Sequence, residues 1–287
     1  MKPPPASDQA VIPMLLGRPE AGVPEAGAGS GPAVGQNARA MTDHDDAARY
    51  ATEAGALLLE LRTRGATDEW ARWSLGDAGD VLANRLLLEV LAAEHANDRV
   101  LSEESADDPR RLEAERVWII DPLDGTREFT EPGRSDWAVH VALWARGAGL
   151  IAGAVALPAQ DRVLCTGAPS GIPAVVGRGL RVVVSRSRPP AAARRVAAAL
   201  GAELVGMGSA GAKAMAVVDG KVDAYVHAGG QYEWDSAAPA AVAAASGFHV
   251  SRVDGTPLVY NRRDPWLPDF VVCRPELAEA VLAAAAS

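Results

Sequence analysis

Lysine and cysteine are scarce in this chain of 287 residues, and aromatic residues make up only 5% of it. The 28 basic residues are outnumbered by 37 acidic ones, which leaves a formal net charge of −9. That sign disfavours nonspecific binding to nucleic acid or to an anionic membrane. Cys165 and Cys273 are the only cysteines, and their spacing matches no disulfide framework, zinc site or redox pair. This cysteine usage is consistent with a reducing compartment.

Long apolar runs are also absent, because no uninterrupted stretch approaches the about 20 residues that a membrane helix requires. The apolar run at 11–16 is broken by proline and makes a poor secretory signal. Hydrophobic residues at 48% and charged residues at 23% are typical of an ordinary globular protein. We therefore expect a cytoplasmic protein whose partner is a small molecule, with no nucleic acid and no membrane involved. The sequence leaves open whether it is a monomer or a homodimer.

The chain is predicted to consist of a tail and two halves. Residues 1–40 are rich in Pro, Gly, Ala and Ser without periodicity, a composition that is typical of a disordered tail. An N-terminal α/β half is expected over 41–175 and a C-terminal α/β half over 176–287. The glycine-rich and proline-containing stretch 171–179 is the best candidate for the junction between them.

The hydrophobic pattern predicts a mixture of helices and strands. Helices are expected over 47–62 and 81–91, the second beginning after Gly79 and Asp80 as an N-cap. The middle of the chain reads as strands, and the last third alternates between the two types. The expected strands are 100–101, 117–120, 137–144, 150–157, 162–165, 181–185, 203–205, 222–227, 249–253 and 270–273, and the later helices are 191–200, 211–218, 236–245 and 276–285. This order predicts a layered α/β architecture.

Three acidic clusters stand at the ends of predicted elements. They are the pair Glu103-Glu104 after a short strand, the hexapeptide Asp121-Pro-Leu-Asp-Gly-Thr126 after another, and Trp234-Asp235 at the start of an apolar helix. Asp80 is a fourth acidic candidate. Taken singly, each has an ordinary explanation: a solvated Glu-Glu pair, a helix cap or an Asp-Gly turn.

The hexapeptide suggests phosphate chemistry. Pro122 fixes one backbone angle and Gly125 permits a tight turn, so the carboxylates of Asp121 and Asp124 can converge. The amides of Gly125 and Thr126 would then point outward, where they can bind a phosphate. Oxygen ligands without His or Cys favour Mg²⁺ or Mn²⁺ over zinc. Carboxylates beside anion-binding amides indicate metal-assisted phosphate chemistry.

Together and in this order, the motifs resemble those of the lithium-sensitive inositol monophosphatase-like phosphatases, from about residue 45 to the C-terminus. The resemblance implies a five-layer α-β-α-β-α sandwich with the active site between its halves. It also implies that the metal ligands are Glu103, Asp121, the carbonyl of Leu123, Asp124 and Asp235. Glu103 and Thr126 match the pair that activates the attacking water, and Asp80 matches a residue that supports a further metal. Asp124, Gly125 and Thr126 match the cradle of the scissile phosphate.

The implied cofactor is Mg²⁺, two or three ions per active site, with Mn²⁺ as an alternative and Li⁺ as an expected inhibitor. These ions would neutralise the phosphate and lower the pKa of a bound water that attacks it in line. One departure concerns the segment before Asp80. The family usually has a Lys and a Ser-Pro-Val-Thr-like stretch there, whereas this chain reads Trp73-Ser-Leu-Gly-Asp77. Asp77 is the residue that could replace a missing ligand of the third metal.

The substrate is inferred from positions around the second half of the site. The stretch Ser185-Arg-Ser-Arg188 resembles the Ser-Arg-Ser-His segment of the CysQ-type bisphosphate nucleotidases of the same superfamily, with Arg188 in place of the His, and the turn that contains Ser209 and Lys213 is similar to theirs. His227 stands where inositol monophosphatases have a Glu that contacts sugar hydroxyls, and a neutral or cationic residue there suits a second phosphate better than a polyol. Arg186, Arg188, Ser209, Lys213 and His227 would then hold the nucleotide and its 5′-phosphate. The resemblance implies removal of the 3′-phosphate from adenosine 3′,5′-bisphosphate, and of the same phosphate from its sulfated relative, 3′-phosphoadenylyl sulfate.

Other interpretations remain open at these positions. The two arginines are equally explained as solvated charge, Lys213 as a helix-surface residue and His227 as a hydrogen-bonded strand histidine. Inositol 1-phosphate and fructose 1,6-bisphosphate are alternative substrates of the same metal site. A non-catalytic phosphometabolite sensor is the alternative from a different class.

Overall fold

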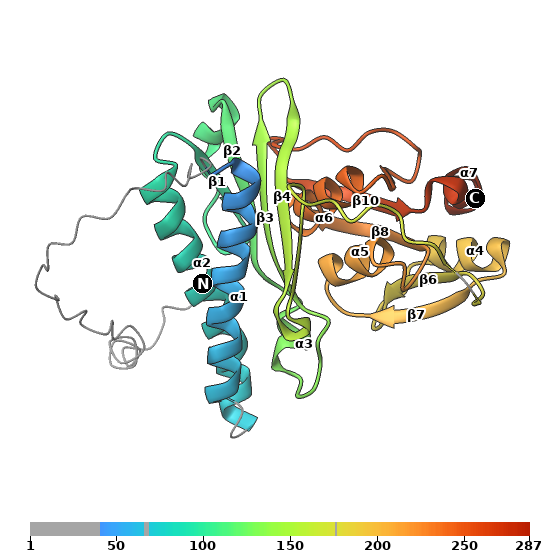
Figure 1. Cartoon of the computed structure of the whole chain (residues 1–287), viewed down its shortest axis with the longest axis horizontal. Helices are drawn as coiled ribbons and strands as arrows, with labels where there is room; N and C mark the ends of the chain where they lie inside the picture. Colours follow the sequence, from blue (N-terminus) through green and yellow to red (C-terminus); the bar gives the residue numbers. More distant parts are fainter. Residues whose placement is uncertain (1–40, 66–68, 176) are drawn as a thin grey trace, which may run out of the picture. The chain divides into compact units, whose positions relative to one another are not determined.

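The computed structural model describes residues 41–65, 69–175 and 177–287, and the earlier part of this chain forms a mixed five-stranded sheet, sheet A (Figure 1). Its strands lie in chain order: β1 (Arg99–Ser102), β2 (Arg116–Asp124), β3 (Ala138–Ala145), β4 (Gly149–Leu157) and β5 (Arg162–Cys165). β1 and β2 are parallel, and the other neighbours are antiparallel. Because β1 and β2 run in the same direction, their carboxyl ends lie at the same edge of the sheet, where the acidic motifs begin.

Sheet B is built from the later part of the chain. In spatial order its strands are β7 (Glu203–Met207), β6 (Arg181–Ser185), β8 (Ala224–Tyr232), β10 (Trp266–Cys273) and β9 (His249–Ser251). β6 pairs in parallel with β7 and β8, whereas β10 is antiparallel to β8 and β9. The carboxyl end of β8 leads directly into the helix that carries Asp235.

Helices cover both outer faces and fill the space between the sheets. α1 (Asp43–Gly65) and α2 (Glu69–Glu94) pack on sheet A, α5 (Ala210–Val218) and α6 (Glu233–Ala245) lie between the sheets, and α4 (Ala191–Leu200) and α7 (Ala278–Ala286) pack on sheet B (Figure 1). The remaining short helices are α3 (Thr126–Thr130), η3 (Pro109–Glu113), η4 (Pro158–Gln160) and η5 (Pro275–Leu277). This arrangement confirms the predicted α-β-α-β-α layers. No helix in the described ranges has both the length and the apolar character needed to span a bilayer.

The strand β2 contributes side chains to two hydrophobic cores, one on each face of sheet A. Val117 and Ile119 pack in the central core with α5, α6 and sheet B, whereas Trp118 and Ile120 pack against α1 and α2. Successive side chains of a strand point to opposite faces, so a strand buried on both faces must be apolar without interruption. The continuous run Val117–Ile120 satisfies this requirement.

The predicted start of the second helix is wrong. α2 begins at Glu69 and continues through Gly79 and Asp80, which therefore do not cap it. Glycines usually weaken a helix, but here they permit close packing. A Cβ atom at Gly79 would lie 2.9 Å from a methyl of Leu123, and one at Gly76 would lie 2.8 Å from a methyl of Thr126. The two glycines let α2 approach the hexapeptide turn.

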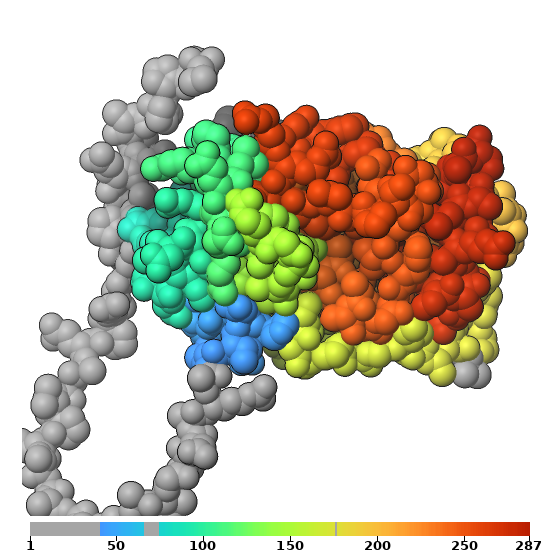
Figure 2. Space-filling model, turned by 90° about the horizontal axis from the view of Figure 1, so that it is seen from above, coloured from blue at the N-terminus to red at the C-terminus, as the bar shows by residue number. Residues whose placement is uncertain are grey.

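The stretch between β5 and β6 contains no helix or strand among its described residues. Figure 2 shows the earlier part of the described chain, in blue to green, beside the orange and red later part. Met41–Ser287 forms one compact unit. The boundary at residue 175 stays a prediction, and the predicted tail at 1–40 lies outside the described residues.

Candidate metal and phosphate site

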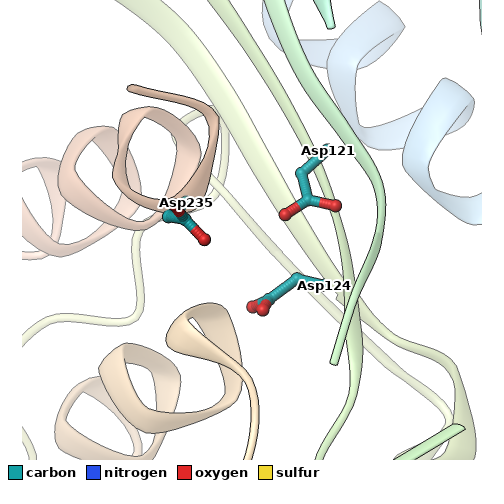
Figure 3. A group of neighbouring side chains, drawn as sticks. All are labelled: Asp121, Asp124 and Asp235. Carbon is teal, nitrogen blue, oxygen red and sulfur yellow. The ribbon is translucent and has the colours of Figure 1, made fainter. Parts of the chain in front are cut away.

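Three carboxylates from two elements converge between the sheets. Asp121 and Asp124 lie at the end of β2, Asp235 lies in the first turn of α6, and one oxygen of each is within 4.8 Å of the others (Figure 3). In a regular strand, positions three residues apart face opposite sides of the sheet. The pairing of β2 with β3 shifts register between Asp121 and Asp124, on either side of Pro122, which cannot donate to the ladder. This irregularity lets both carboxylates face Asp235.

Asp124 is held by the first turn of α5. Its Oδ2 accepts hydrogen bonds from the Ser209 hydroxyl at 2.5 Å and the Gly211 amide at 2.7 Å, and its Oδ1 accepts one from the Ala210 amide at 3.1 Å. Ser209 is the N-cap of the helix and has a left-handed φ of 49°. Free amides at a helix N-terminus favour an anion, so Asp124 is fixed as a carboxylate. Through these hydrogen bonds, Asp124 links the end of β2 to the start of α5.

A buried histidine contacts the same carboxylate and has no counterpart among the residues selected from the sequence. His140 in β3 is fully buried, with Nδ1 3.0 Å from the carbonyl oxygen of Trp234 and Nε2 3.1 Å from Asp124 Oδ2. The second contact is an ion pair rather than an aligned hydrogen bond. A Cβ atom at Gly211 would lie 2.0 Å from Nε2, so only glycine fits there.

The ionic states of this pair follow from its surroundings. Burial alone would lower the pKa of His140, but the facing Asp124 carboxylate raises it above its ordinary value. Burial alone would raise the pKa of Asp124, yet His140, Lys213 and the Ser209 hydroxyl together hold it well below its usual range. β3 pairs with β2 and places His140 opposite Asp121, a pairing that the fold shows and the local sequence does not.

The other carboxylates are crowded and resist ionisation. Burial and the neighbouring Asp124 raise the pKa of Asp121, and the same two causes raise the pKa of Asp235 to about 6. Glu103 is exposed to solvent as a residue. Desolvation of its carboxyl group and the negative charge of Asp235 nevertheless raise its pKa to about 7. Buried like charges are unfavourable unless a cation compensates them. A hard divalent cation fits this set of oxygen donors.

Glu103 lies beside this cluster rather than in its centre. Among the described residues the tight group holds Asp121, Asp124 and Asp235 but not Glu103, which follows β1 and interacts electrostatically with Asp235 and Asp124. Asp80 in α2 borders the same region, where burial and Glu104 raise its pKa to about 7.

Thr126 connects Asp80 to the hexapeptide turn. Its hydroxyl lies 3.3 Å from Asp80 Oδ1 and 3.3 Å from the carbonyl oxygen of Leu123. Gly125 before it has a φ of 90°, and a Cβ atom there would lie 3.2 Å from that of Ser209. Only glycine adopts this left-handed turn without strain. The structure therefore has the tight turn that the sequence predicted at Gly125.

Among the substrate residues predicted from the sequence, Lys213 is buried and not a surface residue. Its Nζ donates to the carbonyl oxygens of Ser209 at 2.6 Å and Gly208 at 3.2 Å, and it lies 5.3 Å from the centre of the Tyr225 ring. Burial lowers its pKa, while the charges of Asp124 and other acids oppose that effect. The interpretation as a solvated helix residue is therefore wrong.

His227, Arg186 and Arg188 differ in the hydrogen bonds and ion pairs that they make with other residues. His227 Nε2 lies 2.9 Å from the carbonyl oxygen of Gly230, as in the strand-histidine interpretation. Burial lowers the pKa of His227, and the positive charges of Lys213 and Arg188 add to that effect. Arg186 pairs with Glu128 at 2.6 Å and Glu131 at 2.5 Å, whereas Arg188 is exposed and has no acidic partner among the described residues.

These features define a layered α/β protein in which buried carboxylates gather between the two sheets. The model of the inositol monophosphatase family matches residues 47–287. The chain belongs to that family, whose members are metal-dependent.

Relatives and solved structures agree with this membership. The chain is 54% identical over 245 residues to the 3′-phosphoadenosine 5′-phosphate phosphatase of Mycobacterium tuberculosis, covering 82% of this chain and 90% of that protein. It is 31% identical over 210 residues to the 3′(2′),5′-bisphosphate nucleotidase CysQ of Escherichia coli, covering 68% and 83%. The crystal structure of CysQ from Bacteroides thetaiotaomicron matches with a TM-score of 0.65 at 27% identity, covering 80% and 96%.

Proposed function

We propose that the protein removes the 3′-phosphate from adenosine 3′,5′-bisphosphate, and from 3′-phosphoadenylyl sulfate, in a Mg²⁺-dependent hydrolysis. The observation that carries this proposal is the convergence of Asp121, Asp124 and Asp235 in one buried group. The similarity to proteins named as phosphatases and nucleotidases of this substrate class supports the choice of ester.

The cation would be held by carboxylates and one backbone oxygen: Asp121, Asp124, Asp235, Glu103 and the carbonyl of Leu123. Bound there, Mg²⁺ supplies charge neutralisation of the phosphate and a lowered pKa of bound water. The amides of Gly125 and Thr126 orient the scissile phosphate at the start of α3. Asp124 receives three hydrogen bonds from α5, so its position is fixed before substrate arrives.

The attacking water is placed by Glu103 and Thr126. The Glu103 carboxyl accepts the proton of the water, whose oxygen bonds to phosphorus while the bond from phosphorus to the 3′ oxygen breaks. The 3′ oxygen leaves as an alkoxide that takes a proton from solvent water, and Glu103 returns the proton it accepted to solvent, so that the sum is addition of one water molecule to the ester. Asp80 accepts the Thr126 hydroxyl hydrogen bond and so holds the orientation of that residue.

The 5′-phosphate is bound by cations from the later part of the chain. The positive charges of Lys213 and Arg188 both lower the pKa of His227, and Ser209 begins the helix that carries Lys213. Arg188 is the exposed cation and supplies the direct contact. Arg186 already pairs with Glu128 and Glu131, so it acts at this site only if the phosphate displaces one of them.

The first prediction compares substrates. Phosphate release with Mg²⁺ is measured for adenosine 3′,5′-bisphosphate, inositol 1-phosphate and fructose 1,6-bisphosphate, with adenosine 3′-monophosphate as the matched nucleotide lacking the 5′-phosphate. We expect kcat/KM to be highest for the bisphosphate nucleotide, by about tenfold to a hundredfold over the monophosphate, since charged hydrogen bonds contribute about 1.5–3 kcal/mol.

The variant Arg188→Ala serves as the test of the second phosphate. It should remove most of that preference by raising KM for the bisphosphate, while Arg85→Ala on the outer surface of α2 should not. Equal kcat/KM for inositol 1-phosphate and the nucleotide would reject the substrate assignment. Absence of any metal-dependent phosphate release would favour the alternative of a non-catalytic sensor.

The second prediction concerns pH and metal. The raised pKa values of Asp80, Glu103 and Asp235, about 7, 7 and 6, mean that the folded protein binds protons more tightly than the unfolded chain. Unfolded carboxyls titrate near about 4, so the destabilisation by this cluster is greatest at pH 8 and declines as the pH falls through 7 and 6. The raised pKa of His140 acts in the same direction.

We therefore expect the metal-free protein to melt at a higher temperature at pH 6 than at pH 8, and added Mg²⁺ to stabilise it more at pH 8. At about a hundred times its dissociation constant, Mg²⁺ should add about 2.7 kcal/mol, or roughly 5–10 °C. Differential scanning fluorimetry with NaCl of matched ionic strength is the control. A Mg²⁺ shift that is larger at pH 6 than at pH 8 would contradict this prediction.

The remaining features are proposed on the same basis. The protein acts in the cytoplasm as a monomer or homodimer, on a small phosphate ester and without nucleic acid or membrane. Two or three Mg²⁺ ions serve each active site, Mn²⁺ can replace them, and Li⁺ inhibits. The excess of acidic residues supports the exclusion of nucleic acid.

A further inference from the structure

A second buried polar cluster lies next to the metal site and is centred on an arginine that the proposed reaction does not use. Arg111 in η3 is fully buried. Its Nε and one terminal nitrogen donate to the two carboxylate oxygens of Asp107 at 2.6 and 3.0 Å. Its other contacts reach far along the chain, to the Asn261 side chain at 2.8 Å and the carbonyl oxygen of Arg262 at 2.9 Å.

Asn261 returns a hydrogen bond and passes the connection onward. Its side-chain amide donates to the carbonyl oxygen of Arg111 at 3.2 Å. Glu233, also fully buried, accepts from the backbone amides of Asn261 at 2.7 Å and Arg262 at 2.8 Å. Asn261 has a left-handed φ of 58°, a conformation that Asn tolerates better than most residues. We call Asp107, Arg111, Asn261 and Glu233 the Arg111 network.

The two ends of the Arg111 network are joined to metal-site carboxylates. Glu233 is the first residue of α6, in the same turn as Asp235. Arg111 lies in the helix that ends the loop beginning at Glu103. The other side of that loop is tied to α2, because Ser102 donates to Asn84 at 2.7 Å and Asn84 donates to Ser105 at 3.1 Å. The loop of Glu103 is thus fixed from both sides.

We propose that Arg111 is a positioning residue, which holds the loop carrying Glu103 at a set distance from Asp235 so that both carboxylates serve one cation site. The inference rests on the proposed function, since it needs that site to bind Mg²⁺. A buried guanidinium suits this role because its planar fork bonds several oxygens in fixed directions, which a lysine ammonium cannot reproduce. Groups that orient metal ligands typically change metal affinity by about 10–100-fold when altered.

The chain offers a matched control in Arg178. This arginine binds Asp223 through two nitrogens, at 2.6 and 3.2 Å, and donates to the carbonyl oxygen of Gly220 at 2.8 Å. Asp223 precedes β8, whereas the metal-site aspartate follows the other end of that strand. Arg178 is therefore a similar multidentate arginine that is remote from the metal site.

The experiment titrates Mg²⁺ into metal-free protein by isothermal calorimetry for the wild type, Arg111→Lys, Asn261→Gly and Arg178→Lys. Asn261→Gly keeps the left-handed backbone and removes only the amide contacts to Arg111, so it decides the question if Arg111→Lys does not fold. We expect both network variants to weaken Mg²⁺ binding at least about tenfold. Arg178→Lys should lower the melting temperature without changing the Mg²⁺ dissociation constant.

The outcomes separate the inference from the proposed function. If the wild type binds no Mg²⁺, the proposed function fails and takes the inference with it. If the wild type binds Mg²⁺ and the folded network variants bind it equally well, only the inference is overturned. It is likewise overturned if Arg178→Lys weakens Mg²⁺ binding as much as they do. In steady-state assays, the network variants should raise the Mg²⁺ concentration needed for half-maximal rate, and saturating Mg²⁺ should restore most of kcat.

Discussion

Asp124→Asn is expected to reduce kcat/KM by at least about a thousandfold and to destabilise the metal-free protein as well. Both oxygens of Asp124 accept hydrogen bonds, Oδ2 from Ser209 and Gly211 and Oδ1 from Ala210. In either orientation, the amide NH₂ of an asparagine would therefore face a donor. Leaving such groups unpaired costs about 1–3 kcal/mol, and each kcal/mol corresponds to about 2–4 °C in a chain of this size.

The stability part of this prediction has a pH signature. Because the pKa of Asp124 is depressed in the folded protein, its carboxylate stabilises the fold above the ordinary carboxyl pKa, and this contribution is lost only in acid. Calorimetric melting at pH 8 compares the metal-free wild type with the variant. Near-normal phosphate release at saturating Mg²⁺, or an unchanged melting temperature, would contradict the central place given to Asp124.

Asp235→Asn is expected to reduce kcat/KM by a similar factor, about a thousandfold, but to raise the melting temperature of the metal-free protein at pH 8. Within the described part of the chain its side chain accepts one hydrogen bond, from the Tyr232 amide to Oδ2 at 2.6 Å, which the asparagine oxygen can keep. The substitution removes a charge whose pKa is raised to about 6 by burial and by Asp124. Relief of this unfavourable ionisation stabilises the fold.

The two aspartate variants control each other, since both remove one charge from the same cluster. Both should abolish the stabilisation by Mg²⁺ in a fluorimetric melt, whereas their effects on the metal-free melting temperature should have opposite signs. If both variants destabilise the metal-free protein equally, then the crowding of carboxylates is not the source of the raised pKa values.

The strands were predictable because their cause is local. Val117–Ile120 is apolar at every position, and a strand buried on both faces needs that composition. The first turns of α2 were not predictable in this way. Gly76 and Gly79 resemble helix breakers in the sequence, but in the fold they permit close contact with Thr126 and Leu123. Whether a glycine interrupts a helix or allows close packing depends on a partner that the local sequence does not name.

The residues of the site also fall into two groups, those that the sequence identified and those that only the structure revealed. The hexapeptide at Asp121 and the Trp234-Asp235 pair were recognised because each motif is contiguous and its residue types are unusual. His140 and Arg111 were not recognised, because each has a nonpolar or mixed local context and partners 94 and 150 residues away in the chain. Lys213 was selected, but its burial and its contacts with Gly208 and Ser209 carbonyls appear only in the fold.

The sequence by itself determined most of the order of elements, the family and the positions of oxygen-donor side chains that would suit a hard divalent cation, since each of these follows from short-range pattern and residue type. Only the tertiary structure decided which charges meet. It placed a histidine and a helix N-terminus on Asp124, left Asp235 without a salt bridge among the described residues, and joined the loop of Glu103 to α6 through one buried arginine. Pairing energies depend on distance and burial, and these are fixed when the sheets and helices pack.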